Sequence, residues 1–122
     1  MRQLLFVLLL LWSVPAAGSV HAQSRPPAAR GSLVDLAHVL GQAHGLAQVC
    51  DASSQIWRVR MMRLIELETP DEAFRNYLFD RFNTGYSAAQ ARHPRCGAGA
   101  RAEASRVAVR GRDLARVIAS AR

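Results

Sequence analysis

From Ser32 onward the apolar residues of this chain recur at intervals of three and four, and this period limits the fold more than any other feature. Leu33, Leu36, Leu40 and Ala47 mark the first such stripe. This interval places apolar side chains on one face of an α-helix, whereas a half-buried strand requires strict alternation. No strand-like alternation competes with the helical period, so the sequence predicts an all-α fold.

Capping residues mark where the first helices begin and end. We expect a first helix at about residues 32–50, with Ser32 and Asp35 as its capping start, and a second helix at about residues 54–68. The segment Thr69-Pro70-Asp71-Glu72 is the strongest boundary signal of the chain. It combines a cap residue at Thr69, a proline at the first helical position and acidic residues near the positive end of the helix dipole.

The second half of the pattern predicts the remaining helices. The third helix is expected to end at Asn83-Thr84-Gly85, because Asn and Gly tolerate the left-handed conformation that closes a helix. A short helix is expected at residues 87–92 and a final helix at about residues 100–120. The sequence therefore predicts a small helical bundle of about four main helices.

The N-terminal segment has the layout of a secretory signal peptide. A short positive start precedes nine large apolar residues, Leu4 to Trp12, which are followed by Pro15 and by small residues that end at Ala22. At ~1.5 Å per residue this run covers about half of a bilayer's hydrocarbon core, which argues against the alternative of an uncleaved membrane anchor. We expect cleavage after Ala22, a periplasmic or secreted location and no transmembrane span in the mature chain.

The same boundaries divide the chain into a signal peptide at residues 1–22, a flexible leader at 23–31 and a helical domain at 32–122. The leader is rich in Pro, Arg and Ala and is expected to be loosely ordered. With 122 residues the chain has room for one domain, and an apolar content of 50% is too high for a disordered tail.

Cys50 and Cys96 both lie in the part of the chain that is expected to be exported. Thiols in an oxidising compartment form disulfides, and two cysteines permit one intramolecular pairing. Closing a loop of this length stabilises a fold by ~4 kcal/mol in the chain-entropy model. The alternative is a Cys–His nucleophile, since His44 lies upstream of Cys50, but no catalytic signature surrounds either cysteine.

Several polar side chains fall on or beside the expected apolar stripes. His44 lies mid-stripe in the first helix, Glu68 in the second and Arg81 in the third, with Arg75 at the edge of the third stripe. An unpaired buried charge is costly, so these groups should find partners. One hypothesis is an internal polar network, such as Glu68 with Arg75, and the other is a ligand pocket built from His44, Glu68 and an arginine. The candidates are His44, Trp57, Arg58, Glu68, Arg75 and Arg81.

Catalytic and metal-binding patterns are missing from the sequence. His44 and Glu68 supply only two candidate metal ligands, and neither the HExxH pattern nor paired-histidine spacing occurs. The GxSxG motif, a phosphate-binding loop and a haem-attachment motif are also absent. We therefore expect no metal, no cofactor and no catalytic residues, and an enzyme is the less favoured interpretation.

Arginine supplies all 16 positive charges, and with nine acidic residues the formal net charge is +7. Arg106, Arg110 and Arg116 of the final helix are candidate contacts for an acidic envelope polymer or an anionic lipid. Glu103 with Arg106 and Asp113 with Arg116 can pair at a spacing of three, which would partly neutralise the positive charge of the final helix. No nucleic acid partner is expected, because export removes the chain from nucleic acid.

Several short strings occur together in one order. They are Leu40-Gly41-x-x-His44-x-Leu46-x-x-x-Cys50, Gln55-x-Trp57-Arg58-x-x-Met61, Glu68 with Pro70, Arg75, Phe82-Asn83-x-Gly85-Tyr86 and Pro94-x-Cys96. This set covers about residues 33–120 and resembles an uncharacterised family of small exported alphaproteobacterial proteins marked by two well-separated cysteines. The resemblance implies a cell-envelope address and a disulfide, and it implies no activity.

These observations leave three hypotheses for function. The first is a non-catalytic structural or adaptor protein of the cell envelope, whose partner is an envelope protein or an acidic polymer. The second is an anion-binding module that uses the C-terminal arginines. The third is a small-ligand protein or enzyme that uses a His44/Glu68 pocket. The oligomeric state does not follow from the sequence.

Overall fold

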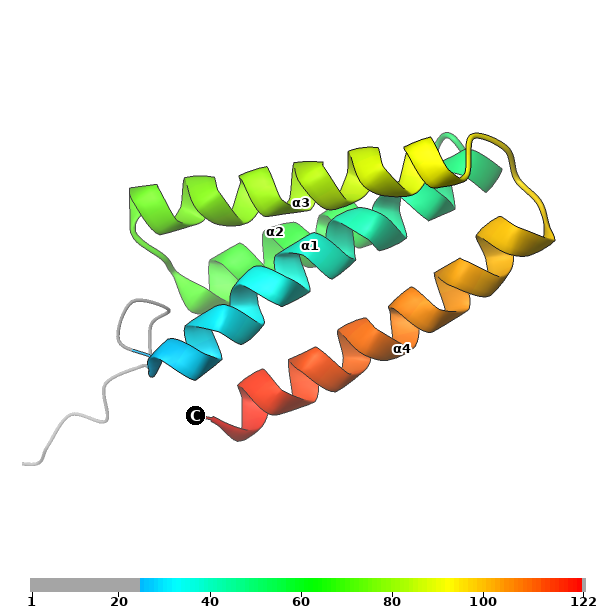
Figure 1. The fold of residues 1–122 in the computed structure, drawn as a ribbon. Helices are drawn as coiled ribbons and strands as arrows, with labels where there is room; N and C mark the ends of the chain where they lie inside the picture. Colours follow the sequence, from blue (N-terminus) through cyan, green and yellow to red (C-terminus); the bar gives the residue numbers. More distant parts are fainter. Residues whose placement is uncertain (1–24, 122) are drawn as a thin grey trace, which may run out of the picture.

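A computed structural model describes residues 25–121, which form four α-helices (Figure 1). The helices are α1 (Pro27–Cys50), α2 (Ile56–Glu68), α3 (Glu72–Arg92) and α4 (Ala98–Ser120), and these residues contain no strand. The all-α fold that the helical period predicts is confirmed. The expected signal peptide and the first residues of the expected leader lie outside the described part of the chain. None of the four helices is both long enough and apolar enough to cross a membrane.

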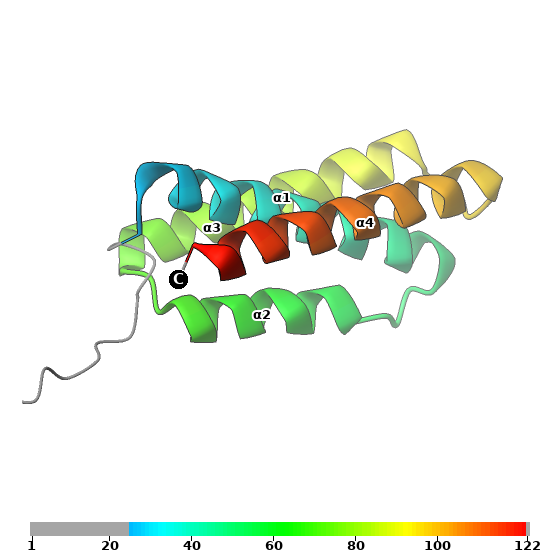
Figure 2. The same ribbon diagram turned by 90° about the horizontal axis from the view of Figure 1, so that it is seen from below.

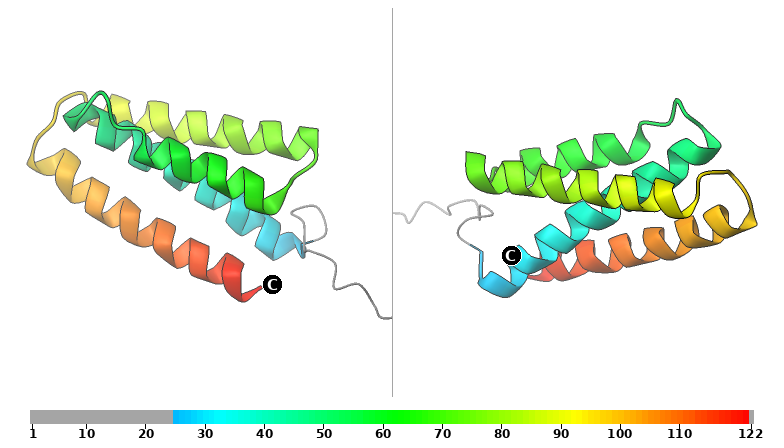
Figure 3. Two further views of the ribbon diagram at one scale, coloured as in Figure 1. Left: turned by 180° about the vertical axis from the view of Figure 1, so that it is seen from behind. Right: turned by 45° about the horizontal axis from the view of Figure 1, so that its top comes forward.

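The first helix, α1, is the centre of the bundle, and each of the other helices packs chiefly against it (Figures 1 and 2). Small residues such as Ala37, Ala43 and Gly45 let neighbours approach α1 from several sides, and all three are buried. The main core cluster takes members from all four helices, including Leu33, Met61, Leu78 and Ile118. Because α1 occupies the centre, α2 and α4 flank it and make little contact with each other (Figure 3).

Two glycines let α1 and α3 pack backbone against backbone. A Cβ atom at Gly41 would lie 1.9 Å from the carbonyl oxygen of Phe82, and one at Gly85 would lie 2.1 Å from that of His38. The expectation that the third helix ends at Asn83–Gly85 is wrong, because α3 continues to Arg92 and includes the segment expected to be a separate short helix. The glycine at position 85 permits a close helix crossing and does not end the helix.

Proline begins α1 earlier than expected. Pro26 occupies the N-cap position and Pro27 the first helical position, where a missing backbone N–H costs nothing. Residues 27–31 of the expected leader are therefore helical. Ser32 lies inside the helix, where its hydroxyl donates a hydrogen bond to the carbonyl oxygen of Ala28 at 3.2 Å. The expected capping start at Ser32 and Asp35 is wrong for this reason.

The boundary between α2 and α3 lies where the sequence predicts it, but its cap is a different residue. Thr69 closes α2 in the left-handed conformation, with φ of 42°. Asp71 is the N-cap of α3, and its carboxylate accepts a hydrogen bond from the backbone N–H of Phe74 at 2.8 Å. Thr69 is needed to end one helix, so it does not cap the next one.

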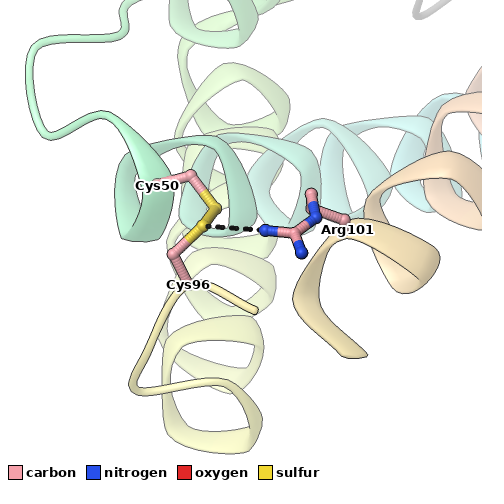
Figure 4. The surroundings of a disulfide bond; sticks show 3 residues. All are labelled: Cys50, Cys96 and Arg101. Atoms are coloured by element: carbon pink, nitrogen blue, oxygen red, sulfur yellow. Dashed lines mark hydrogen bonds between the residues drawn. A yellow bond between two sulfur atoms is a disulfide. The ribbon is translucent and has the colours of Figure 1, made fainter. Parts of the chain in front are cut away.

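A disulfide joins the end of α1 to the loop before α4 (Figure 4). The Cα atoms of Cys50 and Cys96 lie 4.8 Å apart, within the ordinary range for a disulfide. Arg101 on the first turn of α4 directs its guanidinium toward the Sγ atom of Cys96 at 3.8 Å. The expected Cys50–Cys96 pairing is confirmed, and neither cysteine is free to act as a nucleophile.

Candidate functional site

A cleft of about 480 Å³ opens between α1, α2 and α3. This volume is within the range of small-ligand sites. One part of the lining is apolar, with Met61, Phe79 and Phe82, and the other part is polar. The complete lining is His44, Gln48, Gln55, Arg58, Met61, Met62, Phe79, Phe82, Asn83 and Tyr86. We call this the His44 cleft.

His44 is the buried polar residue of the cleft, with 6% of its surface exposed. Its ring lies between those of Phe82 and Tyr86, with centroids 5.6 Å and 5.3 Å away. The Nδ1 atom is buried and has no hydrogen-bond partner among the residues that the structure describes. Burial, and secondly the guanidinium of Arg58, lower the pKa of His44. The imidazole is therefore neutral near pH 7, with one nitrogen that donates and one that accepts.

A chain of hydrogen bonds holds the polar wall of the His44 cleft. The hydroxyl of Tyr86 donates to Oε1 of Gln48 at 2.9 Å, and Nε2 of Gln48 donates to the carbonyl oxygen of Ser54 at 3.1 Å. These bonds connect α3, α1 and the turn before α2. Arg58 of α2 is exposed and is the one charged side chain among the described residues that line the cleft.

The side chains that line the His44 cleft can bind a ligand through both polar and apolar contacts. Among the described residues, the lining contains one imidazole and one guanidinium but no carboxylate, thiol or amine. General acid–base catalysis needs two groups whose pKa values differ, and this lining offers one group that titrates near neutral pH. Between residues 25 and 121, no three His, Cys, Asp or Glu side chains are grouped so as to hold a metal ion.

Glu68 is at a different place from His44. It is fully buried, and its two carboxylate oxygens accept hydrogen bonds from the Nε and Nη2 atoms of Arg25 at 2.7 Å and 2.9 Å. Arg25 also donates to the carbonyl oxygen of Ile118 at 3.2 Å, so the ion pair joins the beginning of α1 to the ends of α2 and α4. Glu68 is not part of the His44 cleft lining, and its arginine partner is Arg25 in place of the expected Arg75.

The other candidates of the expected network are spread over the bundle. Trp57 packs beside both core clusters. Arg75 lies over the ring of Phe79 at 5.5 Å from its centroid, and Nη2 of Arg81 lies 3.3 Å from Nδ1 of His38. Of the six candidates, two line the same cleft: His44 and Arg58.

The three candidate anion contacts do not share one face of α4. Arg106 and Arg110 are exposed one turn apart, but on an ideal helix Arg110 and Arg116 point about 120° away from each other. The pairing of Arg116 with Asp113 is present, with 3.9 Å between Nη1 and Oδ1. The three arginines therefore spread over about 120° of the surface of α4.

Glu103 does not pair with Arg106 as the spacing suggested. Its carboxylate accepts a hydrogen bond from Nη2 of Arg92 at 2.6 Å and contacts the ring of His93. The loop between α3 and α4 folds back, so the side chain faces the end of α3 and not its own helix. The bond from Arg92 lowers the pKa of Glu103.

Two important residues were missed by the sequence analysis. Arg25 lies in the segment expected to be a flexible leader, and nothing local marks it as the partner of a residue 43 positions away. His38 is partly buried, and its pKa is lowered by burial and then by Arg81, with smaller effects from Arg110 and Arg92. The sequence around His38 does not indicate this environment, because the arginines near its ring come from α3 and α4.

The fold and the cleft together define a small all-α protein that is joined by one disulfide and has room for a small ligand. The chain belongs to the family described as "Protein of unknown function (DUF2385)", whose model matches residues 29–121. Neither a curated protein nor a solved structure matches the chain. Most of the cleft lining belongs to the strings that carry the family resemblance, namely His44, Gln55, Arg58, Met61, Phe82, Asn83 and Tyr86.

Proposed function

We propose that this chain is an exported, non-catalytic protein of the cell envelope that binds a small organic anion in the His44 cleft. The observation that carries the proposal is a buried imidazole whose Nδ1 has no partner among the described residues, in a cleft that also contains the guanidinium of Arg58. A buried polar atom without a hydrogen bond costs roughly 1–3 kcal/mol, so a ligand gains affinity if its binding moves the His44 ring enough to supply the bond.

The lining favours a ligand with one anionic group and an apolar body. Arg58 is the single charged residue in the described lining of the cleft, and a guanidinium binds a carboxylate through two parallel hydrogen bonds. Phe79, Phe82 and Met61 offer apolar surface beside it. A small aromatic carboxylic acid combines both features.

Export rests on the layout of residues 1–22 and on the disulfide, since disulfides persist in oxidising compartments. The proposed division is a signal peptide at 1–22, a short leader that begins at 23 and a helical domain that follows it, in a periplasmic or secreted protein. A purely structural or adaptor role is less favoured, because it gives no reason for a ligand-sized cleft around an unpartnered imidazole. An anion site at the C-terminal arginines is less favoured because their side chains point in different directions.

Titration with phenylacetate tests the proposal, with phenylacetamide as its neutral counterpart. Calorimetry at pH 7.5 should show binding of the acid and much weaker binding of the amide. A charge-assisted hydrogen bond contributes about 1.5–3 kcal/mol, so Arg58→Gln should weaken binding by at least roughly tenfold. Arg95→Gln is the matched control, because Arg95 is exposed, lies in the loop between α3 and α4 and does not line the cleft. Equal binding of acid and amide, or unchanged binding by Arg58→Gln, would contradict the proposal.

A further inference from the structure

A second cavity lies between α2 and α4, on a different face of the bundle from the His44 cleft, and has a volume of about 370 Å³. Leu36 and Leu40 of α1 form its floor. Its walls are mainly apolar and consist of Trp57, Leu64 and Leu67 from α2 and Ala108, Gly111 and Ala115 from α4. The cavity exists because α2 and α4 both pack on α1 but hardly touch each other. We call it the α2–α4 groove.

Every charged residue that lines the α2–α4 groove is an arginine. Arg60 and Arg63 come from α2, and Arg112 comes from α4. Arg60 stacks over the ring of Trp57 at 4.4 Å, which places its charge at the apolar wall. Glu66 lies 3.4 Å from Arg63, but both side chains are more than half exposed, and such surface pairs contribute little. The groove thus combines apolar walls with a rim whose charged lining residues are all positive.

We propose that the α2–α4 groove binds the alkyl chain of a free anionic amphiphile, such as a fatty acid, whose head group lies at the arginine rim. The charge of the rim is complementary to a carboxylate, which arginine binds better than any other side chain does. The apolar walls lie beside the arginine rim, which suits a ligand that has a charged head group and an apolar tail. An extended alkyl chain is narrow enough to enter.

Decanoate below its micellar concentration is the probe for this site. Trp57 lines the groove, and with Trp12→Phe in the full chain it is the sole tryptophan, so its fluorescence reports occupancy. Decanoate should bind, and decyltrimethylammonium should bind at least tenfold more weakly because the rim repels it. Shortening the chain to octanoate should weaken binding about two- to fourfold for each methylene lost. Arg112→Gln should weaken decanoate binding and leave the effect of chain length unchanged.

Filling the groove gives the matched test. Ala115→Phe places a ring among the walls and should abolish decanoate binding, whereas Ala119→Phe, at an exposed position of the same helix that does not line the groove, should bind as the parent does. Circular dichroism confirms that both variants are folded. Decanoate binding that survives Ala115→Phe, equal binding of the cationic amphiphile, or binding to anionic vesicles without binding of monomeric decanoate would overturn the proposal. Neither probe series depends on the His44 cleft.

Discussion

Gly85→Ala tests the close crossing of α1 and α3. The new Cβ atom would lie 2.1 Å from the carbonyl oxygen of His38 and 3.0 Å from the backbone nitrogen of Gln42. Both neighbours are backbone atoms of one helix, so neither can rotate away. The helices would have to separate by about 1 Å, and a gap of that size forfeits up to half of the dispersion energy of the facing atoms.

The expected cost of Gly85→Ala is about 2–4 kcal/mol. Overpacking a core costs roughly 1–3 kcal/mol or more, and the partial loss of contacts along α1 and α3 adds to it. Alanine returns at most about 1 kcal/mol through its higher helix propensity. For a domain of this size each kcal/mol corresponds to about 4–8 °C in the melting temperature. A fall of roughly 8–32 °C is therefore expected.

Urea unfolding followed by circular dichroism, with the disulfide intact, measures the change in the free energy of unfolding. Gly31→Ala is the matched control, because a Cβ atom at Gly31 meets nothing within 4 Å and the residue is exposed on α1. It should raise stability by up to about 1 kcal/mol. If Gly85→Ala is as stable as the parent, or if Gly31→Ala is equally harmful, the close crossing does not determine the stability of the bundle.

Three further predictions concern the bonds at the ends of the bundle and the buried histidine. Arg25→Met should lower the free energy of unfolding by about 3–5 kcal/mol, because it removes the guanidinium from a fully buried carboxylate. Adding Glu68→Met should restore most of this loss. If urea unfolding shows that the effects of the two substitutions simply add, the prediction is wrong. Replacing Cys50 and Cys96 together by alanine should lower stability by ~4 kcal/mol, and two titratable thiols in denatured, unreduced parent protein from the periplasm would refute the disulfide. Since the pKa of His44 is lowered in the folded state, its contribution to stability is complete above the ordinary pKa of about 6.5 and is lost as the pH falls below it. His44→Phe should therefore flatten the loss of stability between about pH 7 and pH 5, and an unchanged slope would argue against a buried neutral imidazole.

The sequence predicts the helices well where the signal is local. The turn at Thr69–Glu72 and the apolar stripes of α1, α2 and α4 depend on neighbours three or four residues away, which the sequence displays. Cys50 and Cys96 are paired correctly because two cysteines offer one choice. The error at Gly85 has a physical reason: a glycine that ends a helix and one that admits a neighbouring helix look alike in sequence.

The candidate site is predicted only in part, because polar partners are chosen by the tertiary fold. The position of His44 on an apolar stripe predicts its burial correctly. The proximity of Glu68 to Arg75 in sequence points to the wrong partner, since the beginning of α1 brings Arg25 to the end of α2. The His44 cleft joins residues from three helices, and no local pattern reveals that Tyr86 and Arg58 line the same cleft as His44.

The sharpest test of small-molecule binding at the His44 cleft is nuclear magnetic resonance of protein labelled with ¹⁵N in its histidine rings. The chain has four histidines, so His38 and His93 serve as internal controls in the folded domain. On addition of phenylacetate at pH 7.5 the ring nitrogens of His44 should shift, while those of His38 and His93 stay in place, and Arg58→Gln should suppress the shift. Ring resonances of His44 that do not move at saturating phenylacetate, or that move equally in Arg58→Gln, would contradict binding at this cleft.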